Sequence, residues 1–211
     1  MRKSTFKRGS VEFDRLVSLT DGIYGVAMTL LAFTVGIPQV APEELKKELL
    51  SAHGQLLTFF IAFAVLAFYW LSNHHFVRHL KAIDSVYIGL KLIYLSLVAL
   101  LPLPTALLDR YSQERITVVI YLSVLLLLSL LELALFGWAH HAKLFTSQPH
   151  KRVVRYSILI ALIPVFVFGL AIPVGLHTSP TYALAIWILL NFPLRIAVER
   201  RLGPSTYDAF L

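Results

Sequence analysis

Long apolar runs dominate this chain, and polar residues are mostly confined to the short segments between the runs. About 20 consecutive apolar residues are enough for one helix to cross the hydrocarbon core of a bilayer. By this criterion we predict transmembrane helices over residues 16–37, 55–76, 85–108, 116–138, 154–176 and 180–197. The pattern therefore predicts an all-α integral membrane protein, with six transmembrane helices in a single domain over residues 1–211.

Composition agrees with a membrane protein and argues against catalysis. Hydrophobic residues make up 57% of the chain, charged residues 15%, and the mean hydropathy is +0.73, which is outside the usual range of soluble domains. The chain has no cysteine, which excludes disulfides, iron–sulfur clusters and thiol catalysis. The motifs of serine hydrolases, zinc peptidases and phosphate-binding loops are also missing, so we predict no enzymatic activity and no cofactor.

The net charge of +7 is unevenly distributed. Lys and Arg are concentrated in the N-terminal tail, in the loops after the second and fourth predicted spans, and in the C-terminal tail. The loops on the other side hold only Lys46, Lys47, Arg110 and Arg115. Because cytoplasmic loops carry an excess of basic residues, this asymmetry predicts a multi-pass protein of the cell membrane with both termini in the cytoplasm. The expected partner is therefore the lipid bilayer, and no nucleic acid is needed to explain the charge.

The first predicted helix has two different faces. At about 100° per residue, one stripe consists of bulky apolar side chains, namely Val26, Leu30, Phe33 and Ile37. A second stripe of small residues lies roughly 80° away and consists of Ser18, Gly22, Gly25 and Thr29. Small stripes allow close approach of another helix. The bulky stripe either faces lipid, which is the commoner case, or lines a narrow oligomeric pore as a hydrophobic constriction.

Asp21 lies inside this apolar run, where a carboxylate is costly and normally faces protein or water. It points roughly 150° away from the bulky stripe, so we expect it in a polar network between helices and not in a pore. Arg15 and Lys91 are its candidate partners, although Lys91 is equally able to extend its amine toward the cytoplasm. A proton-carrying role for Asp21 is the sharper alternative.

Other polar residues in the spans leave further alternatives open. His75 and His79 are four residues apart and share a helical face, but no third metal ligand is evident nearby, which favours hydrogen-bonded histidines. His74 or His75 could also sense pH. Glu132, in the fourth predicted span, is either a transport carboxylate or an acid buried against another helix. Together with Asp21 it supports an alternative function as a secondary transporter or proton-coupled carrier.

Three segments, in order along the chain, resemble one known family. The sequence Arg15-Leu-Val-Ser-Leu-Thr-Asp21, continuing to residues 28–31, is similar to the Arg-x-x-x-Phe-Ser-Asp signature of the transmembrane-protein-175 family of lysosomal potassium channels and their prokaryotic relatives. Residues 69–75, Tyr-Trp-Leu-Ser-Asn-His-His, resemble the second-helix motif of that family. Residues 100–108, Leu-Leu-Pro-Leu-Pro-Thr-Ala-Leu-Leu, resemble the end of its third helix.

The resemblance implies a cation channel whose first helix lines the pore, and prokaryotic members with one six-helix unit per chain form homotetramers. The family's constriction residue corresponds to Val26, with Leu30 and Phe33 one and two turns further on. Thr29 matches a family threonine, so the resemblance implies transient K⁺ contacts at Val26 and Thr29. The polar network that supports the pore helix would consist of Arg15, Thr20, Asp21, Trp70, Asn73, His74 and His75.

The chain departs from the family pattern in three places. Leu19-Thr20 replaces Phe-Ser in the signature, Val26 replaces the commoner Ile or Leu, and Lys91 stands where a neutral polar residue is expected. We expect passive, potassium-permeable conduction through a hydrophobic constriction, with potassium as the permeant ion and no cofactor. The carrier and a non-conducting scaffold are the alternatives that an ion-flux measurement would separate.

Overall fold

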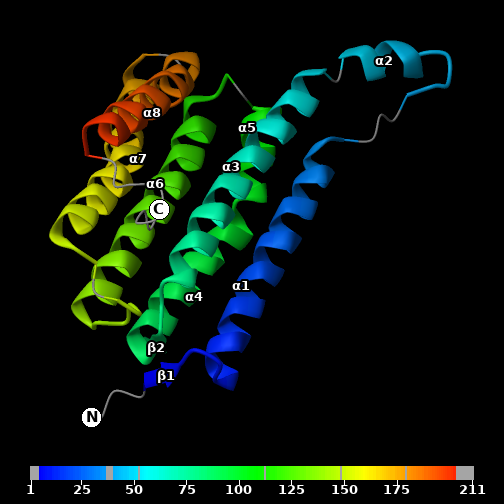
Figure 1. The fold of residues 1–211 in the computed structure, drawn as a ribbon. Coiled ribbons are helices and arrows are strands. Elements are labelled where there is room, and N and C mark those ends of the chain that lie inside the picture. The colour runs from blue at the N-terminus through cyan, green and yellow to red at the C-terminus, as the bar shows by residue number, and fades with distance from the viewer. Residues whose placement is uncertain are drawn as a thin grey trace.

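Helical periodicity in the apolar positions is matched by helices along most of the chain. The computed structural model describes residues 5–36, 40–51, 53–111, 113–147, 149–178 and 180–202. The helices are α1 (Val11–Leu30), the 3₁₀ helix η1 (Leu31–Thr34), α2 (Leu45–Ser51), α3 (His53–Arg78), α4 (Ser85–Leu100), α5 (Pro102–Arg110), α6 (Arg115–His141), α7 (Lys151–His177) and α8 (Pro180–Leu202). Figure 1 shows the long helices running alongside one another as a bundle, with α2 at one end.

Five segments are long and apolar enough to cross a membrane, and they coincide with the first five predicted spans. They are Val11–Thr34, Gly54–Arg78, Ser85–Arg110, Arg115–His141 and Lys151–His177. The third span is interrupted at Leu101, directly before Pro102, because proline lacks the N–H that would continue the helix. Pro164 and Pro173 lie inside α7, which continues through both.

The sixth predicted span, residues 180–197, is helical as part of α8 but is not among these five segments of the described chain. The second half of α8 carries Pro193 and Arg195, followed by Glu199, Arg200 and Arg201. Charged residues at this density lower the mean hydropathy of a helix. The count of six spans therefore stays a prediction.

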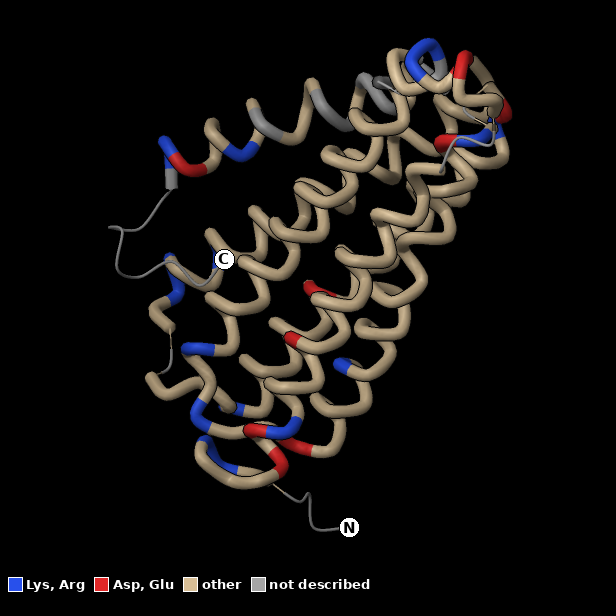
Figure 2. The backbone as a smooth tube through the Cα atoms, turned by 90° about the vertical axis from the view of Figure 1, so that its right-hand side faces the viewer, with Lys and Arg blue, Asp and Glu red and all other residues tan. Residues whose placement is uncertain are grey.

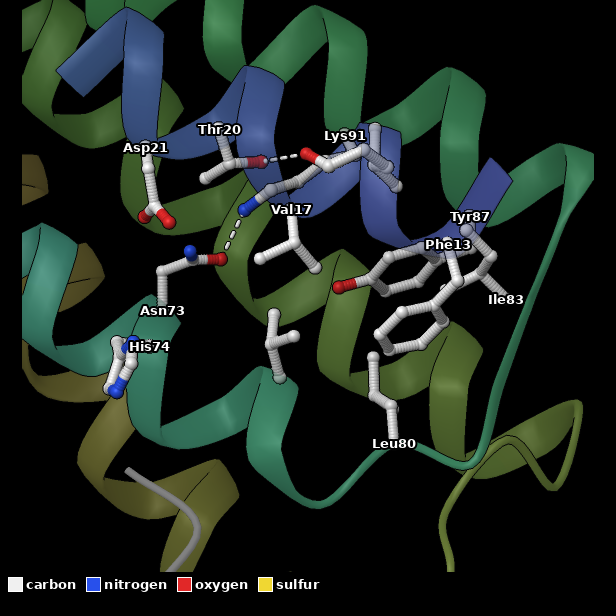
Figure 3. A pocket seen from close by; sticks show the side chains of 12 residues that line it. Phe13, Val17, Thr20, Asp21, Asn73, His74, Leu80, Ile83, Tyr87 and Lys91 are labelled. Atoms are coloured by element: carbon white, nitrogen blue, oxygen red, sulfur yellow. Dashed lines mark hydrogen bonds between the residues drawn. The ribbon is translucent and has the colours of Figure 1, made fainter. Parts of the chain in front are cut away.

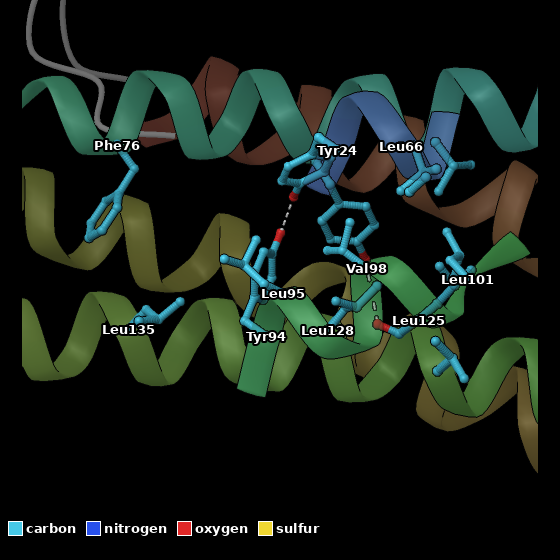
Figure 4. Close-up of a cluster of buried hydrophobic side chains, with 14 of the residues drawn as sticks. Tyr24, Leu66, Phe76, Tyr94, Leu95, Val98, Leu101, Leu125, Leu128 and Leu135 are labelled. Carbon is cyan, nitrogen blue, oxygen red and sulfur yellow. Dashed lines mark hydrogen bonds between the residues drawn. The ribbon is translucent and has the colours of Figure 1, made fainter. Parts of the chain in front are cut away.

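The core of the bundle lies where α1, α3, α4 and α6 meet. Tyr24, Leu66, Leu95, Val98 and Leu125 are all at most 1% exposed, and Figure 4 shows them packed between the helices. Inside this cluster the hydroxyl groups of Tyr24 and Tyr94 are hydrogen-bonded at 2.6 Å. Burying the hydroxyls as a pair avoids the cost of leaving either one without a partner.

The structure adds one small antiparallel sheet to the predicted helical bundle. Strand β1 (Thr5–Lys7) pairs with β2 (Ala82–Asp84), with Phe6 opposite Ile83. A further isolated bridge joins Leu80 to Phe145. Gly9, with φ of +83°, makes the tight turn between β1 and Ser10, whose hydroxyl caps α1 by accepting a hydrogen bond from the Phe13 amide at 3.3 Å. The sheet therefore ties the start of α1 to the loops that follow α3 and α6.

Charged residues gather at the two ends of the bundle and on the second half of α8, and few lie in the middle of the other long helices (Figure 2). The end that carries β1 and β2, together with the loop between α6 and α7, is called the sheet end below. The opposite end carries α2 (Figure 1). An apolar middle between charged ends is the distribution expected for a bundle that spans a bilayer.

Candidate functional site

Helix α1 presents opposite faces to the bundle and to the exterior. Thr20, Tyr24 and Ala27 are buried against the other helices, and their 4-3 spacing marks the inner face. Residues of the predicted bulky stripe lie on the outside, where Val26 is 58%, Leu30 42% and Phe33 83% exposed. Phe33 belongs to η1, and Ile37 lies outside the described residues. The predicted stripe is therefore presented on the surface of the single chain.

The predicted stripe of small residues is also on the outside of α1. Ser18, Gly22, Gly25 and Thr29 are all exposed. A Cβ atom added at Gly22 or Gly25 would meet nothing within 4 Å, so no helix in the described part of the chain packs closely there. The Thr29 hydroxyl donates to the backbone oxygen of Val26 at 2.8 Å, which leaves the oxygen lone pairs of Thr29 available on the surface.

Asp21 is held by the second-span motif. The indole Nε1 of Trp70 donates to Asp21 Oδ1 at 2.9 Å, and this bond connects α3 to α1. The Trp70 ring stacks on His74 one turn further along, with centroids 5.4 Å apart and planes 29° apart. A single contact thus joins the Asp of the first segment to the Trp of the second, 49 residues away in sequence.

Lys91 is buried between α1, α3 and α4. Only 2% of the residue is exposed, and its Nζ donates to Asn73 Oδ1. The amine also lies 4.6 Å from the ring centroid of Tyr94. Neither of the two sequence-based alternatives describes this arrangement, because Lys91 does not extend to the surface and its hydrogen-bond partner is Asn73 and not Asp21.

A small cavity of about 30 Å³ adjoins this contact. Thr20, Asp21, Asn73, His74 and Lys91 line its polar part. Figure 3 shows the amine of Lys91 and the hydroxyl of Tyr87 directed into the space between the helices. Within the described part of the chain, the buried Tyr87 hydroxyl has no hydrogen-bond partner. The cavity has the size and polarity to hold one water molecule, which would supply that partner.

The other predicted network residues differ in burial and in whether they line the cavity. Thr20 is buried and donates to the Leu16 backbone oxygen at 2.8 Å, within its own helix. Arg15 and His75 are exposed and are not among the residues that line the cavity. The structure thus brings together Thr20, Asp21, Trp70, Asn73 and His74. The roles of all seven residues stay predictions.

Further polar contacts join α3 to α6, and sequence reasoning did not find them. Ser72 Oγ donates to Glu132 Oε1 at 2.9 Å, and the hydroxyls of Tyr69 and Ser129 are 2.9 Å apart. The signal was present but ambiguous, because Tyr69 and Ser72 lie three residues apart on α3, as Ser129 and Glu132 do on α6. Matching spacings on two helices favour a shared interface, but they do not say which helices meet.

The site offers no evident place for a resident metal. Among the residues described, no group of three or more His, Asp or Glu is arranged to hold one. His75 and His79 were the sequence candidates. Partial burial lowers the pKa of His79, and the neighbouring charges of Arg78, His75 and Arg8 lower it further. The surroundings of His79 therefore disfavour its protonated form.

Apolar outer faces, charged ends and hydrogen-bonded polar groups in the middle define a multi-pass helical membrane protein. A family model described as "Endosomal/lysosomal potassium channel TMEM175" matches residues 15–102, the part that contains most of α1, the second-span motif and Lys91. Over these residues, which are less than half of the chain, the chain is similar to the TMEM175 family, in agreement with the resemblance in its sequence.

Individual relatives agree with this assignment. A potassium channel of Chamaesiphon minutus is 29% identical over 137 residues, which are 62% of this chain and 66% of the relative. A potassium channel of Streptomyces collinus is 28% identical over 104 residues, which are 49% of this chain and 50% of the relative. The aligned region therefore spans less than two thirds of either relative.

Two solved structures share the fold. A crystal structure of a lysosomal potassium-selective channel TMEM175 homolog from Chamaesiphon minutus superposes with a TM-score of 0.75, covering 90% of this chain and 99% of that one at 21% identity. A variant of the potassium channel MtTMEM175, in complex with a nanobody fusion, gives 0.67 over 94% of this chain and 96% of that one at 17% identity. At these identities the likeness concerns the fold alone.

Proposed function

We propose that this chain is the subunit of a potassium-permeable cation channel, assembled as a homotetramer around α1. The observation that carries the proposal is the outward-facing stripe of Val26, Leu30 and Phe33. Bulky apolar side chains on an exposed face need a covering surface, which in a membrane is either lipid or another subunit. The small, open stripe at Gly22 and Gly25 beside it favours another subunit, because it allows close helix approach.

Four copies of this face, placed around a common axis, form rings of apolar side chains along the ion path. Val26 is the first residue of the bulky stripe along α1, and Thr29 lies about one turn further on with oxygen lone pairs available to an ion. Potassium passes with partial loss of its hydration shell and without a deep binding site. A hydrophobic constriction of this kind closes by dewetting, so small rotations of α1 change conduction. Potassium is preferred over sodium because the larger ion gives up its water at lower cost.

The named function of the relatives supports the same proposal, since both curated relatives and both structural neighbours are called potassium channels. The orientation that we propose places the sheet end in the cytoplasm of the cell, with both termini on that side. It rests on the excess of Lys and Arg in the loops at that end.

The test is ion flux into proteoliposomes that contain the purified chain, with potassium, sodium and protons compared. Val26→Ala widens the proposed ring, and Val26→Asn adds a polar group that wets it; each should raise conductance or lower selectivity severalfold. Leu189→Ala is the matched control, because Leu189 is a bulky apolar residue 67% exposed on α8, away from the proposed pore. Flux that is the same in the Val26 variants and in the wild type would contradict the proposal.

The alternative as a secondary transporter requires Asp21 and Glu132 to share protons or substrate. In the structure the two carboxylates have different partners, Trp70 for Asp21 and Ser72 for Glu132. The same assay distinguishes the two functions. A carrier gives saturable flux that Asp21→Asn abolishes in a folded protein, whereas a channel with this network gives flux that rises linearly with ion gradient. A folded, assembled protein without flux would instead favour a scaffold.

A further inference from the structure

An open groove of about 330 Å³ lies at the sheet end, between the end of α6 and the start of α7. Three of the residues that line it are basic or titratable and mark its rim, namely His140, Lys151 and Arg155. Three others are apolar and form its walls, namely Val154, Ile158 and Leu159. Lys151 and Arg155 are four residues apart, so they project from the same face of α7.

The charged residues on the two chain segments that form the groove are all basic. The sequence contains no Asp or Glu between Glu132 and Glu199, while residues 140–155 also include Lys143 and Arg152. Lys151 and Arg155 are exposed, and neither has an ion-pair partner in the part of the chain that the structure describes. Two unpaired cations beside an apolar groove attract a ligand that is anionic at one end and apolar at the other.

The apolar walls continue toward the middle of the bundle. Below the groove, α7 exposes large side chains every four residues, at Ile158 (36%), Leu162 (38%), Phe166 (63%) and Leu170 (40%). Twelve residues of helix span roughly 18 Å, which is close to the length of an extended acyl chain and about half of a bilayer. The basic rim lies at the beginning of the α7 span, where a lipid headgroup would be.

We propose that this groove binds one anionic phospholipid. The phosphate lies between Lys151 and Arg155, with His140 at its side, and an acyl chain follows Val154, Ile158 and Leu159 into the hydrocarbon layer. Basic pockets between membrane helices on the cytoplasmic side are suited to anionic headgroups. An acidic protein would be held by the charges alone and would leave the apolar walls uncovered, so a lipid fits the groove better.

The experiment measures lipid retention by the purified full-length protein in neutral detergent, using native mass spectrometry with phosphatidylglycerol and phosphatidylcholine of the same acyl chains. The wild type should retain phosphatidylglycerol at least about tenfold more strongly, since each basic contact favours the anionic headgroup. The variant Lys151→Ala/Arg155→Ala should lose this preference. Lys46→Ala/Lys47→Ala removes the same charge from exposed positions at the opposite end and should keep it.

Two further measurements distinguish a bound phospholipid from a bound free anion. Millimolar inorganic phosphate should not displace the lipid, and Ile158→Glu, at an exposed position, should weaken phosphatidylglycerol severalfold by placing a carboxylate below the headgroup. Displacement by phosphate alone would show a free-anion site and overturn the proposal. Equal retention of the two lipids by the wild type would also overturn it, and that measurement needs no variant to fold.

Discussion

The bundle is held together in two different ways. Where α3 meets its neighbours, polar side chains pair across the interfaces, as Trp70 does with Asp21 and Lys91 with Asn73. Where α7 meets α8 and α6, the contact is made mainly by small and apolar side chains, and one hydrogen bond joins the Arg115 guanidinium of α6 to the Leu176 backbone oxygen of α7 at 3.0 Å. A Cβ atom added at Gly175 would lie only 3.2 Å from the Cβ of Ala183 on α8.

The difference shows what each mode of packing can specify. Lipid tails are as apolar as leucine, so helices in a membrane associate through close packing and hydrogen bonds. A hydrogen bond has one partner and one direction, and therefore fixes the register of α1 against α3 and α4. Close packing at a glycine fixes how near two helices come. The interfaces of α3, called the first part below, should be sensitive to the loss of a hydrogen-bond partner. The interfaces of α7, called the second part, should be sensitive to added side-chain volume.

The largest expected effect is the loss of the acceptor for Lys91. Asn73→Leu keeps the volume but leaves the buried amine without its hydrogen bond, which should cost about 3 kcal/mol of unfolding free energy. Thermal or denaturant unfolding in detergent measures it. The double variant Asn73→Leu/Lys91→Met removes both partners and should recover most of that loss. A double variant no more stable than Asn73→Leu alone would show that the contact is not what stabilises this interface.

The next effect tests close packing in the second part. Gly175→Val places side-chain atoms against Ala183 and Val118, and overpacking of this kind costs about 1–3 kcal/mol. Gly169→Val is the control on the same helix, because nothing lies within 4 Å of a Cβ there. Both variants carry the same β-branched side chain in a helix, so their difference in melting temperature reports packing alone. Equal melting temperatures of the two variants would mean that close packing at Gly175 does not stabilise the interfaces of α7.

A smaller effect is expected at the tyrosine pair of the first part. Tyr24→Phe and Tyr94→Phe each leave the other hydroxyl buried without its partner, and interhelical hydrogen bonds in membranes are worth about 0.6 kcal/mol on average. The double variant should lose no more than either single variant, which unfolding of all four proteins would establish. Fully additive losses would mean that the two hydroxyls act independently.

The smallest effect concerns pH. The pKa of His79 is lowered from 6.5, first by burial and then by the charges of Arg78, His75 and Arg8. The unfolded chain therefore binds more protons, and the contribution of His79 to stability is complete above pH 6.5 and is lost as the pH falls toward the folded pKa. His79→Gln should make the melting temperature less dependent on pH between about 7 and 5. An unchanged pH dependence would assign it to other groups.

Hydropathy and helical geometry predicted much of this architecture from the sequence. The first five spans, and the outward position of the bulky stripe that contains Val26, follow from hydropathy and residue spacing. These features depend on one helix at a time. Span ends were less accurate, since α6 and α7 continue for several residues beyond their predicted limits, because polar residues at the interface extend a helix without raising its hydropathy.

Contacts between distant segments could not be predicted. The pairing of Phe6 with Ile83 joins two strands of three residues, which is too short for an alternating pattern to stand out. Lys91 posed a similar problem, because its partner depends on which face of α3 meets α4. The sequence indicated that the Lys91 amine needs a polar partner inside the membrane. Only the way the helices pack determines that this partner is Asn73 and not Asp21.

The sheet at the start of α1 has a mechanical consequence. Backbone hydrogen bonds, including Arg8 N to the Lys81 oxygen at 2.7 Å, fix the N-terminal end of this helix, whereas in the described part of the chain η1 is held by side-chain packing alone. If α1 tilts, it therefore pivots about its N-terminal end. Counted from Ser10, Val26 lies roughly 24 Å and Phe33 roughly 35 Å along the helix axis. Any tilt of α1 therefore moves Phe33 about half as far again as Val26, so in the proposed assembly the pore would widen more at Phe33 than at Val26.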